Sequence, residues 1–187
     1  MEAEIIDGNH FAPTMRETPR QYKNRILGYS LNKDPLRVLA KTPHELVRLI
    51  RGLTTKQLRR RPGPGKWSIA EILAHLADTE LALGFRYRQV LSKNRTKLQA
   101  YDQNAWAHNG KYSKTDPKES LAMFSVLRRS NLRLLSSMPR SRWKNYGMHE
   151  ERGKESMSTI ARLEAGHDIN HLRQIEHIAE ILKRRVR

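Results

Sequence analysis

Apolar residues recur at helical spacing along much of the chain. The clearest case is the stretch 68–94, where they repeat every three or four positions and form one stripe of a helix. The stripe consists of Ile69, Ile72, Leu73, Leu76, Leu83, Tyr87 and Leu91. Ser68 and Glu71 form a capping box at its start, and Trp67 stands where a hydrophobic staple would. The pattern predicts about 25 residues of helix, a length of roughly 37 Å.

A second stretch with this periodicity precedes it in the chain. It begins at Thr42, with Pro43 at the first helical position and Glu45 completing a capping box. Gly52 follows its last apolar residue and suits a helix end. The pattern therefore predicts a shorter helix from residue 43.

Two more helical stretches follow in the second half. Asp116 and Pro117 supply the cap and first position of one, and Pro139 ends it. The other starts near residues 156–159 and continues to about residue 184. Four long amphipathic helices in one small chain favour a helix bundle.

The remaining segments are polar and lack long periodic runs. Residues 1–41 contain scattered prolines, and we expect an irregular N-terminal arm with a short helix near Arg20–Leu27. The link 95–114 has room for a short helix, and the link 140–155 is expected to be a loop or short hairpin. The predicted fold is all-α: a four-helix bundle domain over residues 42–187 whose long links argue against simple up-down-up-down connections.

The charge of the chain raises the question of an anionic partner. Lysine and arginine total 36 against 19 acidic residues, a formal net charge of +17. A field of this sign attracts nucleic acid, anionic lipid or small anions. The basic residues are nevertheless spread along the chain, with the densest run only at Arg59–Arg61. This distribution favours a solvated basic surface over a nucleic-acid groove.

Two absences limit the chemistry. Without cysteine there are no disulfides, thiolate metal sites or cysteine nucleophiles. No window approaches about 18 apolar residues, so we expect no membrane span. The N-terminal residues MEAEIIDGNHFAP lack the pattern of a secretory signal, and we expect a cytoplasmic protein.

His167 and His171 lie four positions apart on the apolar stripe of the last predicted helix. At this spacing two imidazoles are neighbours on the helix and can converge on one ion. A third histidine, His75, lies in the middle of the helix predicted from residue 68 and could face them. The pattern leaves two interpretations open: hydrogen-bonded core histidines, or a metal site open to Zn, Ni, Fe or Mn.

Other polar residues are weaker candidates for the site. Glu80 lies at the centre of an apolar stripe and could be a hydrogen-bond partner of a histidine, a general base or half of a buried ion pair. Gln174 shares the stripe of the histidines and could orient a water or a backbone group. Asp168 and Arg86 are expected on solvated faces, although Asp168 could hydrogen-bond to a ligand histidine and Arg86 could meet an anionic substrate. His149 is expected to be superficial or structural.

Two segments together resemble a known family. The stretches PGPGKWSIAEILAHLADTE and GHDINHLRQIEHI carry the Trp-Ser helix start, the first histidine and the His-x-x-x-His-x-x-Gln pattern of the DinB/YfiT-like superfamily. The resemblance extends over roughly residues 30–184. It implies a four-helix bundle with a metal bound by His75, His167 and His171. The high positive charge departs from the usual member.

The resemblance also suggests a function. It implies a metal-dependent enzyme in which a divalent ion activates a low-molecular-weight thiol or a water, in an S-transferase or a hydrolase acting on a small molecule. We slightly favour thiol transfer, with Glu80 or a metal-bound water moving protons, and expect a homodimer. The alternatives are a basic nucleic-acid-associated bundle and a non-catalytic bundle that binds metal for stability.

Overall fold

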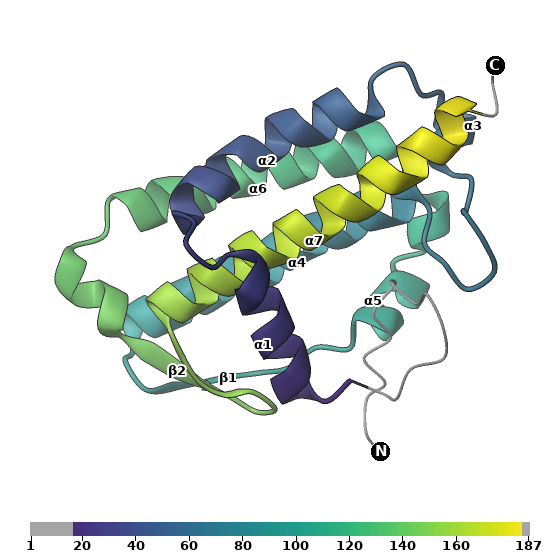
Figure 1. The fold of residues 1–187 in the computed structure, drawn as a ribbon. Coiled ribbons are helices and arrows are strands. Elements are labelled where there is room, and N and C mark those ends of the chain that lie inside the picture. Colours follow the sequence, from purple (N-terminus) through teal and green to yellow (C-terminus); the bar gives the residue numbers. More distant parts are fainter. Residues whose placement is uncertain (1–16, 185–187) are drawn as a thin grey trace.

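Four long helices form the body of the protein (Figure 1). The computed structural model describes residues 17–184. The bundle consists of α2 (Pro35–Ile50), α4 (Ile69–Ser92), α6 (Pro117–Ser136) and α7 (Met157–Arg184). The four-helix bundle predicted from the apolar periodicity is therefore confirmed.

The connections between these helices are not up-down-up-down. α2 packs mainly on α6 and α7, and α4 packs on the same two helices, so α2 and α4 lie diagonally although they follow each other in the chain. α4 and α6 run in the same direction, and the link 93–116 returns along the bundle between them (Figure 1). This long return link is the feature that the sequence indicated.

Smaller elements close one side and one end of the bundle. Three short helices are α1 (Pro19–Tyr29), α3 (Thr55–Leu58) and α5 (Gln103–Asn109), and 3-10 turns cover Tyr112–Lys114 and Arg140–Lys144. The strands β1 (Thr96–Leu98), β2 (Tyr146–His149) and β3 (Gly153–Ser156) form one sheet. β1 is parallel to β2, with Thr96 opposite Gly147, and β2–β3 is an antiparallel hairpin. The sheet thereby joins the return link 93–116 to the link between α6 and α7.

The helix starts follow from local capping chemistry. The Ser68 hydroxyl accepts from Glu71 N, and the Glu71 carboxylate accepts from Ser68 N, as the capping box predicted. Asp116 accepts from Lys118 N, and Pro117 occupies the first turn of α6, where no partner for a backbone N–H is needed. These two starts agree with the sequence prediction.

The start predicted for the first bundle helix was wrong. α2 begins at Pro35, after an Asp34 side chain that accepts from Leu36 N and Arg37 N. The short helix expected near Arg20–Leu27 is present as α1. The arm predicted as irregular over residues 1–41 thus contains α1 and the first turns of α2, and a boundary at residue 42 would cut through α2. Residues 1–16 of that arm lie outside the described part.

The misleading signal was a second cap-and-proline pair inside the helix. The Thr42 hydroxyl bonds back to Val38 O at 3.1 Å, and Pro43 lies within α2. Proline lacks the N–H that would bond to the carbonyl four residues earlier, that of Leu39. That carbonyl instead accepts from Arg128 Nη1 at 2.9 Å, so a side chain from α6 replaces the lost bond.

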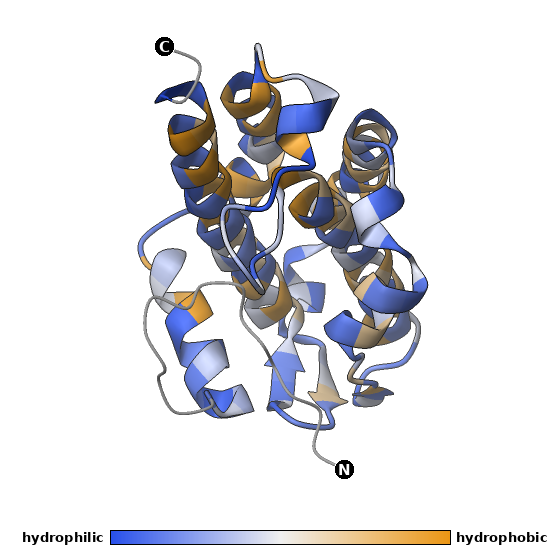
Figure 2. Cartoon of the chain, turned by 90° about the vertical axis from the view of Figure 1, so that its right-hand side faces the viewer, coloured by the Kyte–Doolittle hydropathy of each residue, from blue (hydrophilic) through white to orange (hydrophobic). Residues whose placement is uncertain are grey.

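The apolar core has two parts. The apolar sides of the helices face one another (Figure 2). One cluster lies around Leu46, Ile72 and Phe124, and the other around Leu39, Tyr87 and Ile160. Buried polar residues of α4, α6 and α7 lie between them along the helices. Among residues 17–184, no helix combines the length and apolarity needed to cross a membrane.

Candidate metal centre

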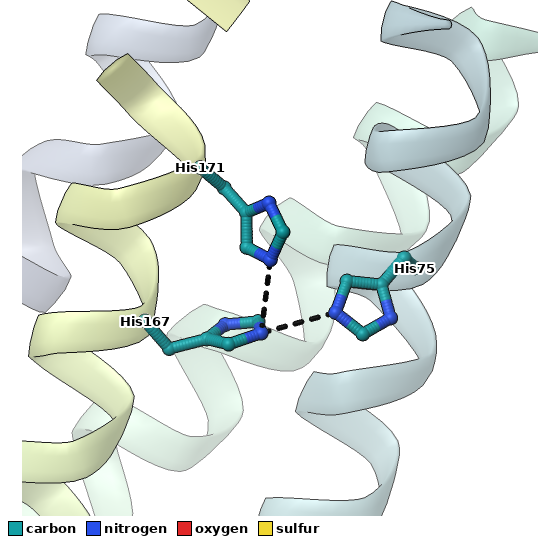
Figure 3. Close-up of side chains that lie close together, drawn as sticks. All are labelled: His75, His167 and His171. Carbon is teal, nitrogen blue, oxygen red and sulfur yellow. Dashed lines mark hydrogen bonds between the residues drawn. The ribbon is translucent and has the colours of Figure 1, made fainter. Parts of the chain in front are cut away.

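Three histidines from two helices converge in the bundle (Figure 3). His75 projects from α4, and His167 and His171 project from α7. The Nε2 atom of His167 is 3.0 Å from Nε2 of His75 and 3.1 Å from Nε2 of His171. One nitrogen of each ring lies within 4.8 Å of the others. The structure thus brings together the three residues that the sequence singled out.

The protonation state of these rings suits cation binding. Burial, and then the neighbouring histidines, lower the pKa of His75 and His167 well below the usual value, so both are neutral at physiological pH. The Nδ1 atom of His171 is 2.9 Å from Gln174 Oε1 and donates to it, which leaves the lone pair of His171 Nε2 pointing at His167. Gln174 therefore contacts a histidine, whereas the sequence suggested a water or a backbone group.

The three nitrogens cannot satisfy one another. A neutral imidazole nitrogen carries either one proton or one lone pair, so His167 Nε2 can hydrogen-bond properly to only one of its two neighbours. A cation between the three atoms accepts all three lone pairs. Around a tetrahedral ion with metal–nitrogen distances of 2.0–2.1 Å, ligand nitrogens lie about 3.3 Å apart, close to the separations observed. The donor set fits a divalent transition metal.

Trp67 packs against this cluster. The centroid of its ring lies 5.0 Å from that of His75, and its edge meets Tyr112. The Tyr112 hydroxyl in turn donates to Asp78 Oδ2 at 2.5 Å. The tryptophan before the α4 cap therefore has a packing role over a candidate ligand.

Arg128 forms the centre of a buried charged layer. Its Nε and Nη2 atoms donate to Glu80 Oε1 at 3.0 and 2.6 Å, and Nη1 and Nη2 donate to Asp168 at 2.6 and 3.0 Å. The side chains of all three residues are 1% exposed. Asp168 is thus not solvated as predicted, because α6 places a guanidinium opposite it. For Glu80 this placement favours the ion-pair alternative.

A second carboxyl group, that of Glu164, lies in this layer. Its Oε1 atom is 3.4 Å from Arg128 Nη2 and is buried without a hydrogen-bond partner among the described residues. Burial and the charge of Glu80 raise the pKa of Glu164, whereas Arg128 offsets the burial of Glu80 and lowers its pKa. Tyr87 donates to the other oxygen of Glu164. Of these two carboxyl groups, Glu164 is therefore the one that holds a proton more readily.

A cavity of about 110 Å³ lies beside His167. Its walls come from α1, α4, α7, the return link and the β2–β3 hairpin. They are formed by Tyr22, Ile26, Thr79, Leu83, Arg86, Ala100, Tyr101, Asp102, Gln103, His149, Glu151, Arg152, Leu163, Glu164 and His167. Along α4 the lining extends from Thr79 to Arg86, roughly 10 Å of helix. The cavity therefore joins a candidate ligand, His167, to a distant polar wall.

Two residues of that wall differ from the sequence prediction. Arg86 is 6% exposed and not on a solvated face, because the return link covers it and Gln99 O accepts from its Nη2 at 2.6 Å. His149 is 2% exposed, so of its two expected roles the structural one fits.

Arg128 is a buried residue that was not predicted from the sequence. A signal was present, since Arg128 and Asn131 stand on the buried stripe of α6 between Phe124 and Leu135, where an apolar residue would be expected. Asn131 donates to the backbone and side-chain oxygens of Glu80, both at 3.0 Å. Polar residues on an apolar stripe predict buried partners on facing helices.

The fold and site define a four-helix-bundle protein with a three-histidine centre. A model of the DinB superfamily matches residues 39–175. The chain belongs to the DinB superfamily.

Similar proteins occur in Bacillus. The "Putative metal-dependent hydrolase YfiT" of Bacillus subtilis (strain 168) is 26% identical over 167 residues, which cover 88% of this chain and 92% of that protein. A "Putative metal-dependent hydrolase" of Bacillus cereus (strain G9842) is 27% identical over 142 residues, or 76% of this chain and 80% of that one.

The solved structure of YfiT from Bacillus subtilis has a TM-score of 0.71 at 23% identity and covers 98% of this chain and 97% of that one. It is described as "a probable metal-dependent hydrolase with an unusual four-helix bundle topology". At this level of identity the likeness establishes the fold.

Proposed function

We propose that this protein is a metal-dependent enzyme in which His75, His167 and His171 hold one divalent cation beside a substrate cavity. The observation that carries the proposal is the convergence of three Nε2 atoms, one of them from His167, which lines that cavity. A divalent ion on three imidazoles supplies Lewis acidity, which makes a water or a thiol nucleophilic at neutral pH. The names of the relatives support a hydrolase.

A thiol nucleophile would have to come from solution. The chain has no cysteine, so a thiol could enter only as a low-molecular-weight cosubstrate. Water as nucleophile gives a hydrolase, and a thiol cosubstrate gives an S-transferase. Both use the same histidines, and the substrate is in either case a small molecule that fits the cavity.

Residues of the chain assist by holding protons and excluding water. Glu164 lines the cavity as a neutral acid and can donate its proton to a group bound there, while Tyr87 fixes its other oxygen. Glu80, proposed from the sequence to move protons, contributes here through its charge, which raises the pKa of Glu164. Leu83 and Leu163 make part of the lining apolar and so displace water.

Elemental analysis of protein purified without chelators or an affinity tag that binds metal tests the proposal. We expect about one equivalent of metal in the parent. His75→Ala and His167→Ala should lose it while retaining helical circular dichroism. His177→Ala is the matched control, since it removes an exposed histidine from the same helix and should keep the metal.

The outcome also separates the alternatives. Metal-loaded protein should then cleave model esters or amides, or transfer a thiol when one is added, and the two His→Ala variants should not. Metal that is bound only to maintain folding would leave unfolded protein after its removal and would favour a non-catalytic bundle. Absence of metal even after incubation with Zn, Ni, Fe and Mn would overturn the proposal. Salt-sensitive, metal-independent DNA binding would then support the nucleic-acid alternative.

Two further expectations are part of this proposal and stay predictions. We expect a homodimer and a cytoplasmic location. Sedimentation of the metal-loaded protein at several concentrations, and fractionation of the source cells, check them.

A further inference from the structure

Arg86 is a buried cation without a carboxylate partner. Its side chain lies at a wall of the cavity and is 6% exposed. Only Nη2 forms hydrogen bonds within residues 17–184, to Gln99 O and towards His149, and no carboxylate there is close enough for an ion pair. The other two arginines of this region differ, since Arg128 and Arg152 each pair with glutamate. A buried guanidinium is costly unless it is paired.

His149 faces two hydrogen-bond donors at once. Glu151 N donates to its Nδ1 at 3.2 Å, and Arg86 Nη2 approaches its Nε2 at 3.3 Å. Burial, Arg152 and Arg86 lower the pKa of His149 to about 3, so the ring is neutral. A neutral imidazole has one lone pair and can accept only one of these bonds. One N–H group at this wall therefore lacks an acceptor.

The other charged groups of the cavity do not supply the missing acceptor. The Asp102 carboxylate caps α5 through Asn104 N and Ala105 N, at 2.8 and 3.1 Å. Glu151 is exposed, and burial together with Glu80 keeps Glu164 protonated. Tyr101 places its ring 5.6 Å from the Arg86 guanidinium, which buttresses the cation without neutralising it. The wall thus has surplus donors and an unmatched positive charge.

We propose that Arg86 and His149 form an oxyanion subsite that binds the carboxylate or phosphate group of the substrate or cosubstrate. A guanidinium binds both groups through parallel N–H bonds. The cavity, at about 110 Å³, has room for several non-hydrogen atoms, since a single water needs only about 10–15 Å³. The same cavity reaches His167, so an anion held at Arg86 would extend its uncharged part towards the three histidines. The inference rests on the proposed function only for the reaction at the three histidines; anion binding at Arg86 does not depend on it.

Titration followed by NMR tests the subsite without requiring turnover. The probes are acetate, inorganic phosphate and acetamide, which matches acetate in shape but lacks charge. In low-chloride buffer, acetate or phosphate should shift the amide resonances of Ala100, Glu151 and Arg152 in a saturable manner. Whichever of the two binds more tightly identifies the kind of oxyanion. Acetamide should bind at least about tenfold more weakly, since charged hydrogen bonds are roughly twice as strong as neutral ones.

Two variants locate the binding. Arg86→Gln should weaken anion binding at least about tenfold. Arg162→Gln, an equal loss of charge at an exposed position of α7, should leave it unchanged. Equal binding of acetate and acetamide by the parent would overturn the subsite even if Arg86→Gln did not fold. Unchanged anion binding by a folded Arg86→Gln variant would also overturn it.

The two proposals fail independently. Anion-selective shifts in a protein that takes up no metal would leave the subsite standing and remove the metal-dependent reaction. One equivalent of metal without anion selectivity would do the reverse.

Discussion

At the scale of single residues, Arg128 ties three helices to one another. Its guanidinium donates to Glu80 on α4, to Asp168 on α7 and to the Leu39 carbonyl of α2. The last of these is the carbonyl to which Pro43, lacking an N–H group, cannot donate. Removing the arginine would therefore leave this carbonyl without its hydrogen bond and the two carboxylates without their counter-ion.

Replacement of Arg128 should be strongly destabilising. Arg128→Met would leave Glu80 and Asp168 buried without their counter-ion, and we expect a loss of about 3–5 kcal/mol in the free energy of unfolding. Urea denaturation followed by circular dichroism measures it. Arg129→Met changes the exposed neighbour and should alter stability by less than about 0.5 kcal/mol. Equal effects of the two changes would contradict the role assigned to Arg128.

A change at Gln174 should weaken metal binding without removing a ligand. Gln174→Ala takes away the acceptor for His171 Nδ1, so the ring loses its fixed orientation. We expect a 10- to 100-fold lower metal affinity, measured by competition with a chromophoric chelator. Glu180→Ala, an exposed change on the same helix, is the control. An unaltered affinity in Gln174→Ala would show that packing alone orients His171.

The buried histidines predict loss of stability in acid. Burial lowers the pKa of His149 to about 3. It lowers the pKa of His75 and His167 well below the value of an unfolded histidine, which is about 6.5. Below that value the unfolded chain binds more protons, so the metal-free protein becomes less stable as pH falls from 7 to 5. Glu164, whose pKa is raised, acts in the opposite direction over this range.

A variant isolates one histidine from this balance. His149→Gln cannot titrate, so it should lose about 1–2 kcal/mol less stability than the parent between pH 7 and 5, after allowance for solvent screening. Urea denaturation at both pH values measures the difference. Identical slopes for His149→Gln and the parent would mean that the pKa of His149 does not differ between the folded and the unfolded protein.

At the scale of elements, α1 lies very close to α7. A Cβ atom built at Gly166 would stand 2.0 Å from the carbonyl oxygen of Ile26, so only glycine allows this approach. Ile26 and Tyr22 on α1 form part of the cavity wall. The contact therefore determines how tightly one wall closes over His167.

Gly166→Ala should separate these two helices. The added methyl group meets backbone, which cannot rotate away, so the clash outweighs the gain in helix propensity of about 1 kcal/mol. We expect lower stability, and faster hydrogen exchange of α1 amides than of α4 amides. Gly28→Ala, where a Cβ meets nothing within 4 Å, should be neutral or stabilising by up to about 1 kcal/mol. Protected α1 amides in Gly166→Ala would contradict this account.

The sequence predicted the elements where local signals were unambiguous. The capping box at Ser68 and the cap at Asp116 mark real helix starts, and the spacing of His167 and His171 with His75 anticipated their convergence. The start at Pro35 was missed because Thr42 and Pro43 carry the same local signature. The helix continues through Pro43 because Arg128 of α6 donates to the Leu39 carbonyl that Pro43 leaves without a hydrogen bond. The choice between the caps at Asp34 and Thr42 thus depends on a contact with another helix.

The cavity could not be predicted in this way. Arg86 and His149 belong to segments far apart in the chain, and each has an ordinary polar neighbourhood in the sequence. Only the parallel pairing of β1 with β2 places the return link against the hairpin and encloses them. A single sequence contains no periodic signal for such a long-range pairing.

At the scale of the whole molecule, a bound metal would join two helices from opposite halves of the chain. Because the three-histidine geometry exists only in the folded state, metal should stabilise that state by mass action. At a free concentration 100 times its Kd the gain is about 2.7 kcal/mol, visible as a higher Tm. His75→Ala should abolish the shift. An equal shift in that variant would place metal binding elsewhere.

The overall charge also has a structural side. In the densest basic run, Arg61 pairs with Glu71, and Arg59 donates to the carbonyls of Lys114 and Thr115. These arginines connect the link after α2 to other segments of the protein. The run is thus partly used for internal contacts, which agrees with a dispersed basic surface more than with a nucleic-acid groove.

The division of the cavity between bundle and links has an evolutionary consequence. The histidines stand on α4 and α7, whereas much of the distant wall comes from the return link and the β2–β3 hairpin. Substitutions, insertions or exchanges in those two segments can therefore alter the shape and charge of the cavity without moving the three histidines. A lineage that keeps this bundle can diversify its chemistry by loop replacement, and a graft of both segments together, because they pair as one sheet, is the natural unit of such exchange.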